Sequence, residues 1–268
     1  MFTYINGEFY PADKAKISVR DRGFRVGDGC FETILIHAGI PYQLALHMER
    51  LTKSLKYLKI KAGTKTFPKI IKKTITKNKI REGFLRIAVT RGQSGFGYSA
   101  KNIGNPTIII ETEKSAPKKI KPAKLWLSSY IKQPLPGKII SNINSVLARI
   151  EAEENGCVDS LMLDNEKKIC ETSAANIFWF IGNKLYTPKS GMLEGTIRSA
   201  IIRLSPFSII RGNFTMDDIK KADAVFITNV AWKILPVVEL QPLGLQWKES
   251  EKIKILYQLL TEDIHGLD

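Results

Sequence analysis

Hydrophobic and polar residues alternate in several short stretches at the start of the chain, and this period of two predicts β-strands. The stretch from Tyr4 to Tyr10 has this pattern around Asn6-Gly7, a dipeptide typical of tight hairpin turns. Phe31 to Ile36 is strand-like, Phe84 to Thr90 alternates in the same way, and Thr107 to Thr112 is rich in β-branched residues. We therefore expect a hairpin and three further strands in this part of the chain.

Apolar residues with helical spacing lie between these strands and predict two amphipathic helices. The first carries Leu44, Met48, Leu51, Leu55 and Leu58, and the second carries Phe67, Ile70, Ile71 and Ile75. The segment from Glu113 to Ala123 is rich in lysine and proline, so we expect a linker there. The prediction is a small N-terminal α/β domain over residues 1–117, a linker over 118–123 and a larger C-terminal domain over 124–268.

The second part of the chain mixes strand and helix patterns. Strands are expected at 125–130, 160–163, 176–181, 184–187 and 224–228, and a loop ending at Pro236 follows the last of them. Helices are expected at about 143–150, closed by Gly156, at 197–204, around 215–221 and at 253–264. The predicted fold class is therefore α+β with two domains.

Composition narrows the class of protein. A hydrophobic content of 44% over 268 residues is ample for buried cores, and no apolar run is long enough to cross a bilayer. The start of the chain lacks the plan of a signal peptide, so a cytoplasmic location is expected. Three cysteines without CxxC spacing, and three histidines of which none pair at ligand spacing, predict neither a disulfide framework nor a metal site.

The formal charge of +15 is compatible with nucleic acid, an anionic membrane or acidic small molecules as partners. The lysines are spread along the chain, and no nucleic-acid-binding signature accompanies them. We therefore expect a solvated basic surface that steers small anionic substrates, with neither nucleic acid nor membrane as partner.

Two residues 33 positions apart, Lys138 and Glu171, are the leading candidates for chemistry. An amine that forms an imine and a carboxylate that holds a protonated ring nitrogen are what a pyridoxal phosphate enzyme requires. Lys138 lies just before a predicted helix, and Glu171 precedes small residues and an apolar strand. On local sequence alone, a surface role stays open for both residues.

Candidates for holding a phosphate group also occur. Arg50 lies one helical turn after His47 and offers a forked donor. Gly195-Thr196-Ile197 offers backbone N–H groups and a hydroxyl at the start of a predicted helix. A plain helix start is the alternative for Gly195.

Five motifs in order give the chain a resemblance to a known family. They are Asp21 to Thr33, His47 to Leu51, the Lys138 to Glu171 pair, Leu193 to Arg198, and Thr228-Asn229-Val230 through Pro236-Val237. In this order they resemble the class-IV aminotransferases, which are fold-type-IV pyridoxal phosphate enzymes, over essentially the whole chain. The resemblance implies a D-amino acid aminotransferase-like fold and a homodimer.

The resemblance also implies roles for single residues. Lys138 is expected to carry the pyridoxal 5′-phosphate and Glu171 to bind its ring nitrogen, and both are expected to be catalytic. The remaining cofactor-binding residues are expected to be Arg50, Gly195, Thr196, Ile197, Thr228 and Asn229. The residues expected to bind a small-molecule substrate are Arg25, Phe31, Arg91 and Tyr98.

Within the family, three features resemble 4-amino-4-deoxychorismate lyase, an enzyme of folate biosynthesis. They are the glycine-rich segment Arg91 to Ser99, the run Glu171 to Trp179, and Ile143 where branched-chain aminotransferases have a tyrosine. Two positions depart from the lyase pattern, because Asn142 stands one place late and Phe96 replaces an arginine. The alternatives are an aminotransferase of branched-chain or D-amino acids, and a basic non-catalytic binding protein with the same fold.

Overall fold

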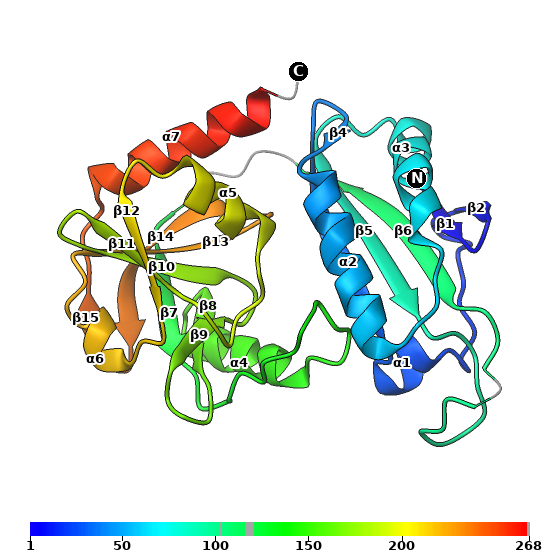
Figure 1. Ribbon diagram of the computed structural model, residues 1–268, viewed down its shortest axis with the longest axis horizontal. Helices are drawn as coiled ribbons and strands as arrows, with labels where there is room; N and C mark the ends of the chain where they lie inside the picture. The colour runs from blue at the N-terminus through cyan, green and yellow to red at the C-terminus, as the bar shows by residue number, and fades with distance from the viewer. Residues whose placement is uncertain (102, 116–120, 267–268) are drawn as a thin grey trace. The chain divides into compact units, whose positions relative to one another are not determined.

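The computed structural model describes residues 1–101, 103–115 and 121–266, and the chain divides into two compact units (Figure 1). Unit 1 comprises Met1–Pro117, Pro136–Asn142 and His265–Asp268, and unit 2 comprises Lys118–Leu135 and Ile143–Ile264. The expected boundary between residues 117 and 118 and the first half of the expected linker, residues 118–120, lie outside the described residues. None of the helices in the described part of the chain is long and apolar enough to cross a membrane.

Unit 1 is built around one antiparallel sheet with the strand order β2-β1-β6-β5-β3-β4. Its strands are β1 (Phe2–Ile5), β2 (Glu8–Pro11), β3 (Gly29–His37), β4 (Ile40–Pro41), β5 (Gly83–Thr90) and β6 (Thr107–Lys114). Its helices are α1 (Arg22–Val26), α2 (Leu44–Leu58), α3 (Phe67–Asn78) and a 3-10 turn at Thr64–Thr66. The hairpin and the two longer helices are therefore confirmed, whereas α1 had no expected counterpart.

The sequence explains these elements locally. Asn6 and Gly7 both have positive φ, which lets a two-residue turn join β1 to β2. The apolar stripes of α2 and α3 bury Leu51, Leu55 and Ile71 against the sheet. Inward residues of β3 and β5 complete this core, so the period-two pattern of the strands meets the helical stripes.

Residues Pro136–Asn142 belong to unit 1, although the sequence division placed Lys138 in the C-terminal domain. The Phe31 N–H donates to the Lys138 carbonyl at 2.9 Å, and the Ile140 N–H donates to the Gly29 carbonyl at 2.9 Å. The segment thus pairs with the first residues of β3. Such a pairing between positions far apart in sequence leaves no local pattern, which is why sequence reasoning assigned the segment by chain order.

Unit 2 contains a larger mixed sheet with the order β12-β11-β10-β13-β14-β7-β8-β9, and β15 pairs with β14. Its strands are β7 (Ala123–Leu127), β8 (Asp159–Leu163), β9 (Ile169–Thr172), β10 (Asn176–Ile181), β11 (Lys184–Pro188), β12 (Ser208–Gly212), β13 (Ala224–Asn229), β14 (Lys233–Gln241) and β15 (Leu245–Gln246). Its helices are α4 (Ile143–Glu154), α5 (Thr196–Leu204), α6 (Met216–Ile219) and α7 (Glu251–His265, whose last residue falls in unit 1).

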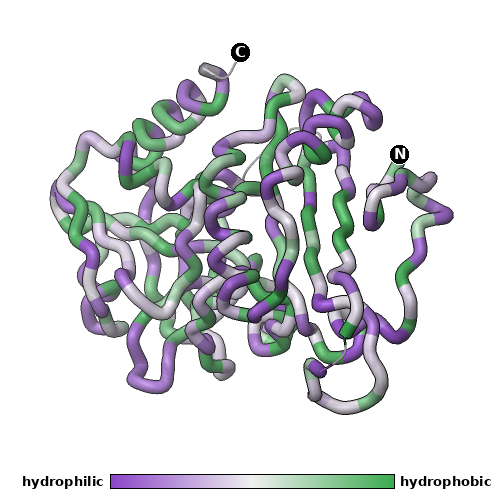
Figure 2. Tube along the Cα trace, turned by 45° about the vertical axis from the view of Figure 1, so that its right-hand side comes forward, coloured by the Kyte–Doolittle hydropathy of each residue, from purple (hydrophilic) through white to green (hydrophobic). Residues whose placement is uncertain are grey.

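The core of unit 2 lies on this sheet and includes Trp179, Ile227 and Leu235. Figure 2 shows hydrophobic positions running through the strands and an alternation of hydrophobic and hydrophilic residues along the C-terminal helix α7. The expected loop ending at Pro236 was wrong, because Pro236 lies inside β14 opposite Phe226 of β13. The fold class expected from the sequence is confirmed.

Candidate active site

In unit 1, a buried carboxylate on β3 holds two residues of helix α2. Glu32 accepts from Arg50 Nε at 2.7 Å and from Arg50 Nη2 at 2.6 Å, so the arginine binds it with both arms of its fork. His47 Nδ1 lies 2.7 Å from Glu32 Oε2. Both Glu32 and His47 are fully buried, whereas the Arg50 side chain stays partly exposed. Arg50 is thereby fixed in place with 12% of its side-chain surface exposed.

Charges in this cluster are set by burial and by the close partners. Burial raises the pKa of Glu32, but the hydrogen bonds from Arg50 and His47 outweigh it and hold the pKa below its usual range. Burial lowers the pKa of His47, and the nearby Arg50 and Lys138 cations lower it further. Glu32 raises the pKa of His47, but the net shift is downward. The cluster therefore carries an ionised Glu32 beside a neutral imidazole.

Lys138 lies beside this cluster. Its Nζ stands 4.7 Å from the centre of the Phe31 ring, and its backbone N–H donates to Ser54 Oγ on α2 at 3.2 Å. A side chain on Gly137 would clash with Ser54, so a glycine there permits the close approach of the segment to α2. The structure thus brings Arg50, Phe31 and Lys138 together in unit 1.

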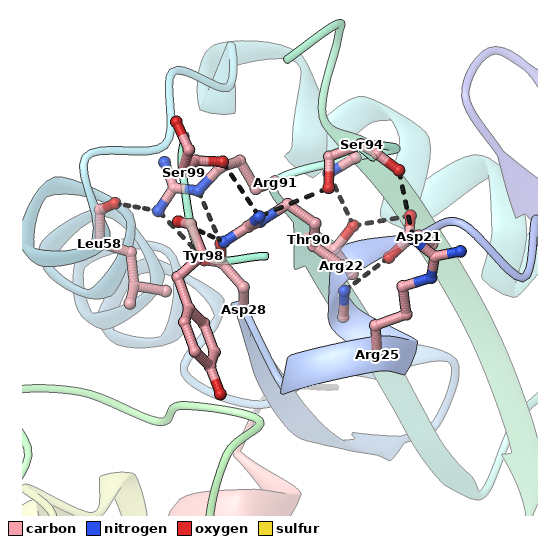
Figure 3. Close-up of polar contacts among 12 residues, drawn as sticks. Asp21, Arg22, Arg25, Asp28, Leu58, Thr90, Arg91, Ser94, Tyr98 and Ser99 are labelled. Atoms are coloured by element: carbon pink, nitrogen blue, oxygen red, sulfur yellow. Dashed lines mark hydrogen bonds and ion pairs between the residues drawn. The ribbon is translucent and has the colours of Figure 1, made fainter. Parts of the chain in front are cut away.

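A second carboxylate of unit 1, Asp28, joins two arginines (Figure 3). It accepts from Arg22 Nε at 2.7 Å and from Arg91 Nε and Nη2 at 2.7 and 3.0 Å. Burial raises the pKa of Asp28, but the hydrogen bonds from Arg91 and Arg22 outweigh it and lower the pKa below its usual value. Arg22 also donates to the carbonyls of Gly97, Tyr98 and Ser99. This network orders the glycine-rich segment.

The four expected substrate residues differ in how they are placed. Arg91 also donates to the Leu58 and Lys59 carbonyls at the end of α2, so four of its five N–H groups are used within unit 1. Arg25 donates to loop carbonyls through Nε and Nη1, and its guanidinium carbon lies 4.8 Å from the centre of the Phe96 ring. Among the described residues, Nη2 makes no hydrogen bond. The Tyr98 side chain is exposed and points away from the network (Figure 3).

In unit 2, Glu171 ends up with a partner on each carboxylate oxygen. Its Oε1 lies 2.8 Å from Lys132 Nζ, and its Oε2 accepts from Asn176 Nδ2 at 2.8 Å. Asn176 also donates to the Leu193 carbonyl at 2.7 Å. The carboxylate is buried and held in one orientation, as expected for a group that binds a ring nitrogen.

The start of helix α5 lies against Asn176. A Cβ on Gly195 would clash with Asn176 Oδ1, although the φ of Gly195 suits any residue. Thr196 and Ile197 follow and are buried, and no side chain caps this helix start. The N-terminal turn of α5 therefore has backbone N–H groups of the kind that bind anions, and glycine at position 195 permits the close approach of the Asn176 side chain.

Two turns frame Glu171. Asn229 Nδ2 donates to the Ala174 carbonyl at 3.2 Å, and the Thr228 hydroxyl donates to the Lys233 carbonyl across the β13–β14 turn. The buried Asp159 accepts from the side chains of Thr172 and Ser173. Thr228 and Asn229 thus hold the loops beside the carboxylate.

These residues fit a planar cofactor with a ring nitrogen and a phosphate group. Glu171 is a buried, oriented acid, Gly195 precedes an uncapped helix start whose backbone N–H groups suit a phosphate, and Lys138 is an amine against an aromatic ring. These residues are divided between the two units: Lys138 and Arg50 belong to unit 1, and Glu171 and Gly195 belong to unit 2.

Sequence reasoning missed several polar residues that the structure places at these positions. Glu32 could have been found, because it occupies the inward register of β3 between Cys30 and Ile34. Asp159 and Lys132 carry no comparable signal. A single lysine among 41 basic residues shows its contact with Glu171 only in three dimensions.

The chain is similar to a family of known enzymes over most of its length. The model of the family described as amino-transferase class IV matches residues 29–240. A putative branched-chain-amino-acid aminotransferase of Methanocaldococcus jannaschii is 31% identical over 254 residues, covering 90% of this chain and 88% of that protein. The aminodeoxychorismate lyase of Bacillus subtilis is 25% identical over 278 residues, covering 98% and 95%.

Solved structures share the fold. A branched-chain amino acid aminotransferase from T.th., solved with pyridoxamine 5′-phosphate, superposes with a TM-score of 0.93 at 24% identity, covering 100% of this chain and 95% of that one. The branched-chain aminotransferase of Thermoproteus uzoniensis has the same TM-score of 0.93 at 22% identity, covering 99% and 95%. At these identities the likeness shows the fold alone. It confirms the expected fold type.

Proposed function

From the membership of this chain in the class IV amino-transferases, a family of pyridoxal 5′-phosphate enzymes, we propose that it is a lyase that converts 4-amino-4-deoxychorismate into 4-aminobenzoate and pyruvate. The protein is an enzyme with pyridoxal 5′-phosphate as its cofactor. The non-catalytic alternative is therefore set aside. The reaction would supply the 4-aminobenzoate used in folate biosynthesis.

The observation that carries the lyase proposal is the residue at position 143. The resemblance gives branched-chain enzymes of the family a tyrosine at this position, whereas this chain has Ile143, which begins α4 and is 63% exposed. An aliphatic side chain provides no phenol for the ring oxygen of the cofactor. The run from Thr172 to Trp179 and the similarity to the Bacillus subtilis lyase across 98% of this chain support the same choice.

Each expected residue then has a definite task. When bound, pyridoxal phosphate withdraws electrons from the bonds next to the substrate nitrogen. Lys138 would hold the cofactor, take the proton from the substrate ring carbon and return a proton to the departing enolpyruvyl group. Glu171 would keep the proton on the ring nitrogen. Arg50 and the start of α5 at Gly195 would bind the phosphate group.

For the substrate carboxylates we propose Arg25 ahead of Arg91. Arg25 keeps the Nη2 donors outside its present bonds, whereas Arg91 spends four of five N–H groups on Asp28 and on the end of α2. The Phe31 ring, 4.7 Å from Lys138 Nζ, would pack against the substrate ring. Tyr98 remains a proposed substrate contact whose side chain would have to turn inward.

A second candidate function is transfer of the amino group of branched-chain or D-amino acids. The 31% identity to the putative aminotransferase of Methanocaldococcus jannaschii favours it. The same Lys138 would then move a proton at the α-carbon of the amino acid. We further propose a homodimer and a cytoplasmic location, the latter supported by three free, buried cysteines.

Product analysis of the purified enzyme separates the two activities. With 4-amino-4-deoxychorismate as substrate, we expect release of 4-aminobenzoate and pyruvate, and no keto acid from branched-chain or D-amino acids. Lys138→Ala should lose this release by at least roughly a thousandfold. The control Lys124→Ala changes an exposed lysine paired with Glu239 and should act as wild type. Keto acid formation without 4-aminobenzoate would overturn the lyase assignment.

A further inference from the structure

A second lysine contacts the carboxylate proposed for the cofactor ring. Lys132 Nζ lies 2.8 Å from Glu171 Oε1 and 3.2 Å from Ser145 Oγ on α4. Its backbone N–H donates to the Leu163 carbonyl at 2.8 Å, which ties the residue to the end of β8. Both charged side chains are about nine-tenths buried, at 11% and 7% exposure. Such a buried pair is fixed in geometry and is weakly screened by solvent.

The position of Lys132 excludes it from the role given to Lys138. In pyridoxal phosphate the aldehyde carbon stands para to the ring nitrogen. A lysine that touches the acid of the ring nitrogen therefore sits at the opposite end of the ring from the aldehyde. Lys132 can act on the ring only through Glu171.

We propose that Lys132 is a positioning residue of the cofactor site, which orients Glu171 and competes with the ring nitrogen for its charge. The proposal rests on the assignment of Glu171 to the ring nitrogen. Asn176 occupies Glu171 Oε2, so Lys132 and Asn176 together fix the plane of the carboxylate. The geometry leaves the remaining lone pairs of the carboxylate for the ring N–H.

The ion pair with Lys132 should lower the pH at which the ring nitrogen loses its proton. A carboxylate that already neutralises an ammonium group stabilises a second cation less than an unpaired carboxylate does. The ring nitrogen should therefore release its proton at a lower pH in the wild type than in an enzyme without this lysine. A ring nitrogen that holds its proton less firmly withdraws electrons less, so Lys132 limits the strength of the electron sink.

Arg198 and Cys170 also interact electrostatically with Glu171 within unit 2. Arg198 of α5 is buried, and its Nη1 is paired with Glu194 at 2.6 Å; burial lowers its pKa, while Glu194 and Glu171 act in the opposite direction. Cys170 precedes Glu171, and burial raises its pKa to about 12, so it is a neutral thiol. Lys132 is the cation that these contacts place in direct hydrogen-bonding distance of Glu171.

The protonation state of the ring nitrogen tests the proposal directly. The holoenzyme is loaded with cofactor labelled with ¹⁵N in the ring, and its ¹⁵N chemical shift is followed against pH. In Lys132→Met the titration should move upward by about one pH unit, whereas Lys132→Arg should follow the wild type. The control Glu166→Gln removes a carboxylate from the wall of the hollow of about 470 Å³ that Lys132 also lines, and it should leave the titration in place.

If the ring nitrogen titrates at the same pH in the wild type and in Lys132→Met, the proposal is overturned. Loss of stability in Lys132→Met without a change in the ring titration would make the residue merely structural and would also overturn it. Borohydride reduction followed by peptide mapping must attach the cofactor to Lys138. Attachment to Lys132 would contradict the geometric argument above.

Unfolding of the cofactor-free protein separates this proposal from the proposed function. Lys132→Met should lower the unfolding temperature by roughly 5 °C, because it leaves a buried carboxylate beside Asn176 alone. Adding Glu171→Gln to that variant should restore most of the loss, since the carboxylate is then neutral. Additive effects of the two substitutions would overturn the pairing. If pairing is found while no cofactor attaches to Lys138, the proposed function fails on its own.

Discussion

At the scale of single residues, the unit 1 site is organised by one buried glutamate. Glu32 ties Arg50 and His47 to β3, and the Phe31 ring next to it in sequence lies against Lys138. Arg50, the arginine proposed to bind the phosphate, is therefore held by a residue that the expected motif roles did not include. Fixing its guanidinium in advance reduces the entropy that binding an anion would otherwise cost.

We expect Glu32→Gln to lower the free energy of unfolding at neutral pH by about 3 kcal/mol, because it removes the buried carboxylate that Arg50 binds with both arms of its fork. The folded-state pKa of Glu32 lies below its usual value of about 4.3, so its contribution is complete above that pH and is lost as pH falls through the lower folded value. Urea unfolding at several pH values measures both effects.

The matched control is Glu49→Gln on the same helix, whose carboxylate is more than half exposed and paired with Lys53. It should change stability by only a few tenths of a kcal/mol at any pH. A difference between wild type and Glu32→Gln that persists undiminished in acid would contradict the role of the ionised carboxylate.

At the scale of elements, the start of α5 and the start of β10 depend on each other. Gly195 begins the helix, and Asn176 begins the strand and reaches both Glu171 and the Leu193 carbonyl. Because a Cβ at position 195 would meet the Asn176 amide, the helix start and the orientation of the carboxylate cannot be changed separately. The two proposed ends of the cofactor, phosphate and ring nitrogen, are thereby spaced by rigid structure.

Gly195→Ala tests this dependence. We expect the dissociation constant of pyridoxal phosphate to rise at least tenfold, equal to about 1.4 kcal/mol, because Asn176 must shift and release Glu171. Cofactor fluorescence titration gives the constant, and far-ultraviolet circular dichroism shows whether the fold is kept. In Gly63→Ala the new Cβ meets nothing within 4 Å, so this variant should bind like wild type. Unchanged binding by Gly195→Ala would refute the dependence.

Elements were also the scale at which sequence patterns worked best. The helical stripes of α2, α3 and α7 and the hairpin at Asn6-Gly7 were recognised because their side-chain periodicity is local. The short helix α1 and the strand β12 were not. The residues of α1 lack an apolar stripe, and the five residues of β12 have two adjacent isoleucines in place of an apolar–polar alternation, so neither shows a clear local period.

At the scale of the whole molecule, the surplus of positive charge matters for anionic ligands. A formal charge of +15 raises the concentration of anions near the surface, and the cofactor carries a phosphate dianion. The charge comes from lysines and arginines spread along the chain, so its long-range effect belongs to the molecule and to no single site.

We therefore expect the association rate constant of pyridoxal phosphate to fall roughly tenfold between low salt and about 0.5 M salt, where screening shortens the reach of charges to a few ångströms. Stopped-flow absorbance measures the rate. Pyridoxal without the phosphate group is the matched control, and its association should depend little on salt. The same salt dependence for both ligands would rule out electrostatic steering of the phosphate.

The sequence by itself determined the family, the fold class and the identity of the main candidates, Lys138, Glu171, Arg50 and Gly195. It could do so because each of these residues lies in a short motif, and the order of the motifs along the chain can be read from the sequence. The tertiary structure alone decided what surrounds them. It pairs the backbone of Lys138 with the start of β3 and joins Arg91 to Asp28 by hydrogen bonds. It also brings Lys132 into an ion pair with Glu171.

Those decisions follow from burial. A charged side chain removed from water must find a partner, and the partner is chosen by whichever element packs beside it in space. For Glu171 that partner is Lys132, in the loop between β7 and α4 and 39 positions earlier in the chain (171 − 132), a separation that no local pattern encodes. The order of residues along the chain therefore identifies the candidate groups, whereas tertiary packing determines the neighbours that influence their charge and orientation.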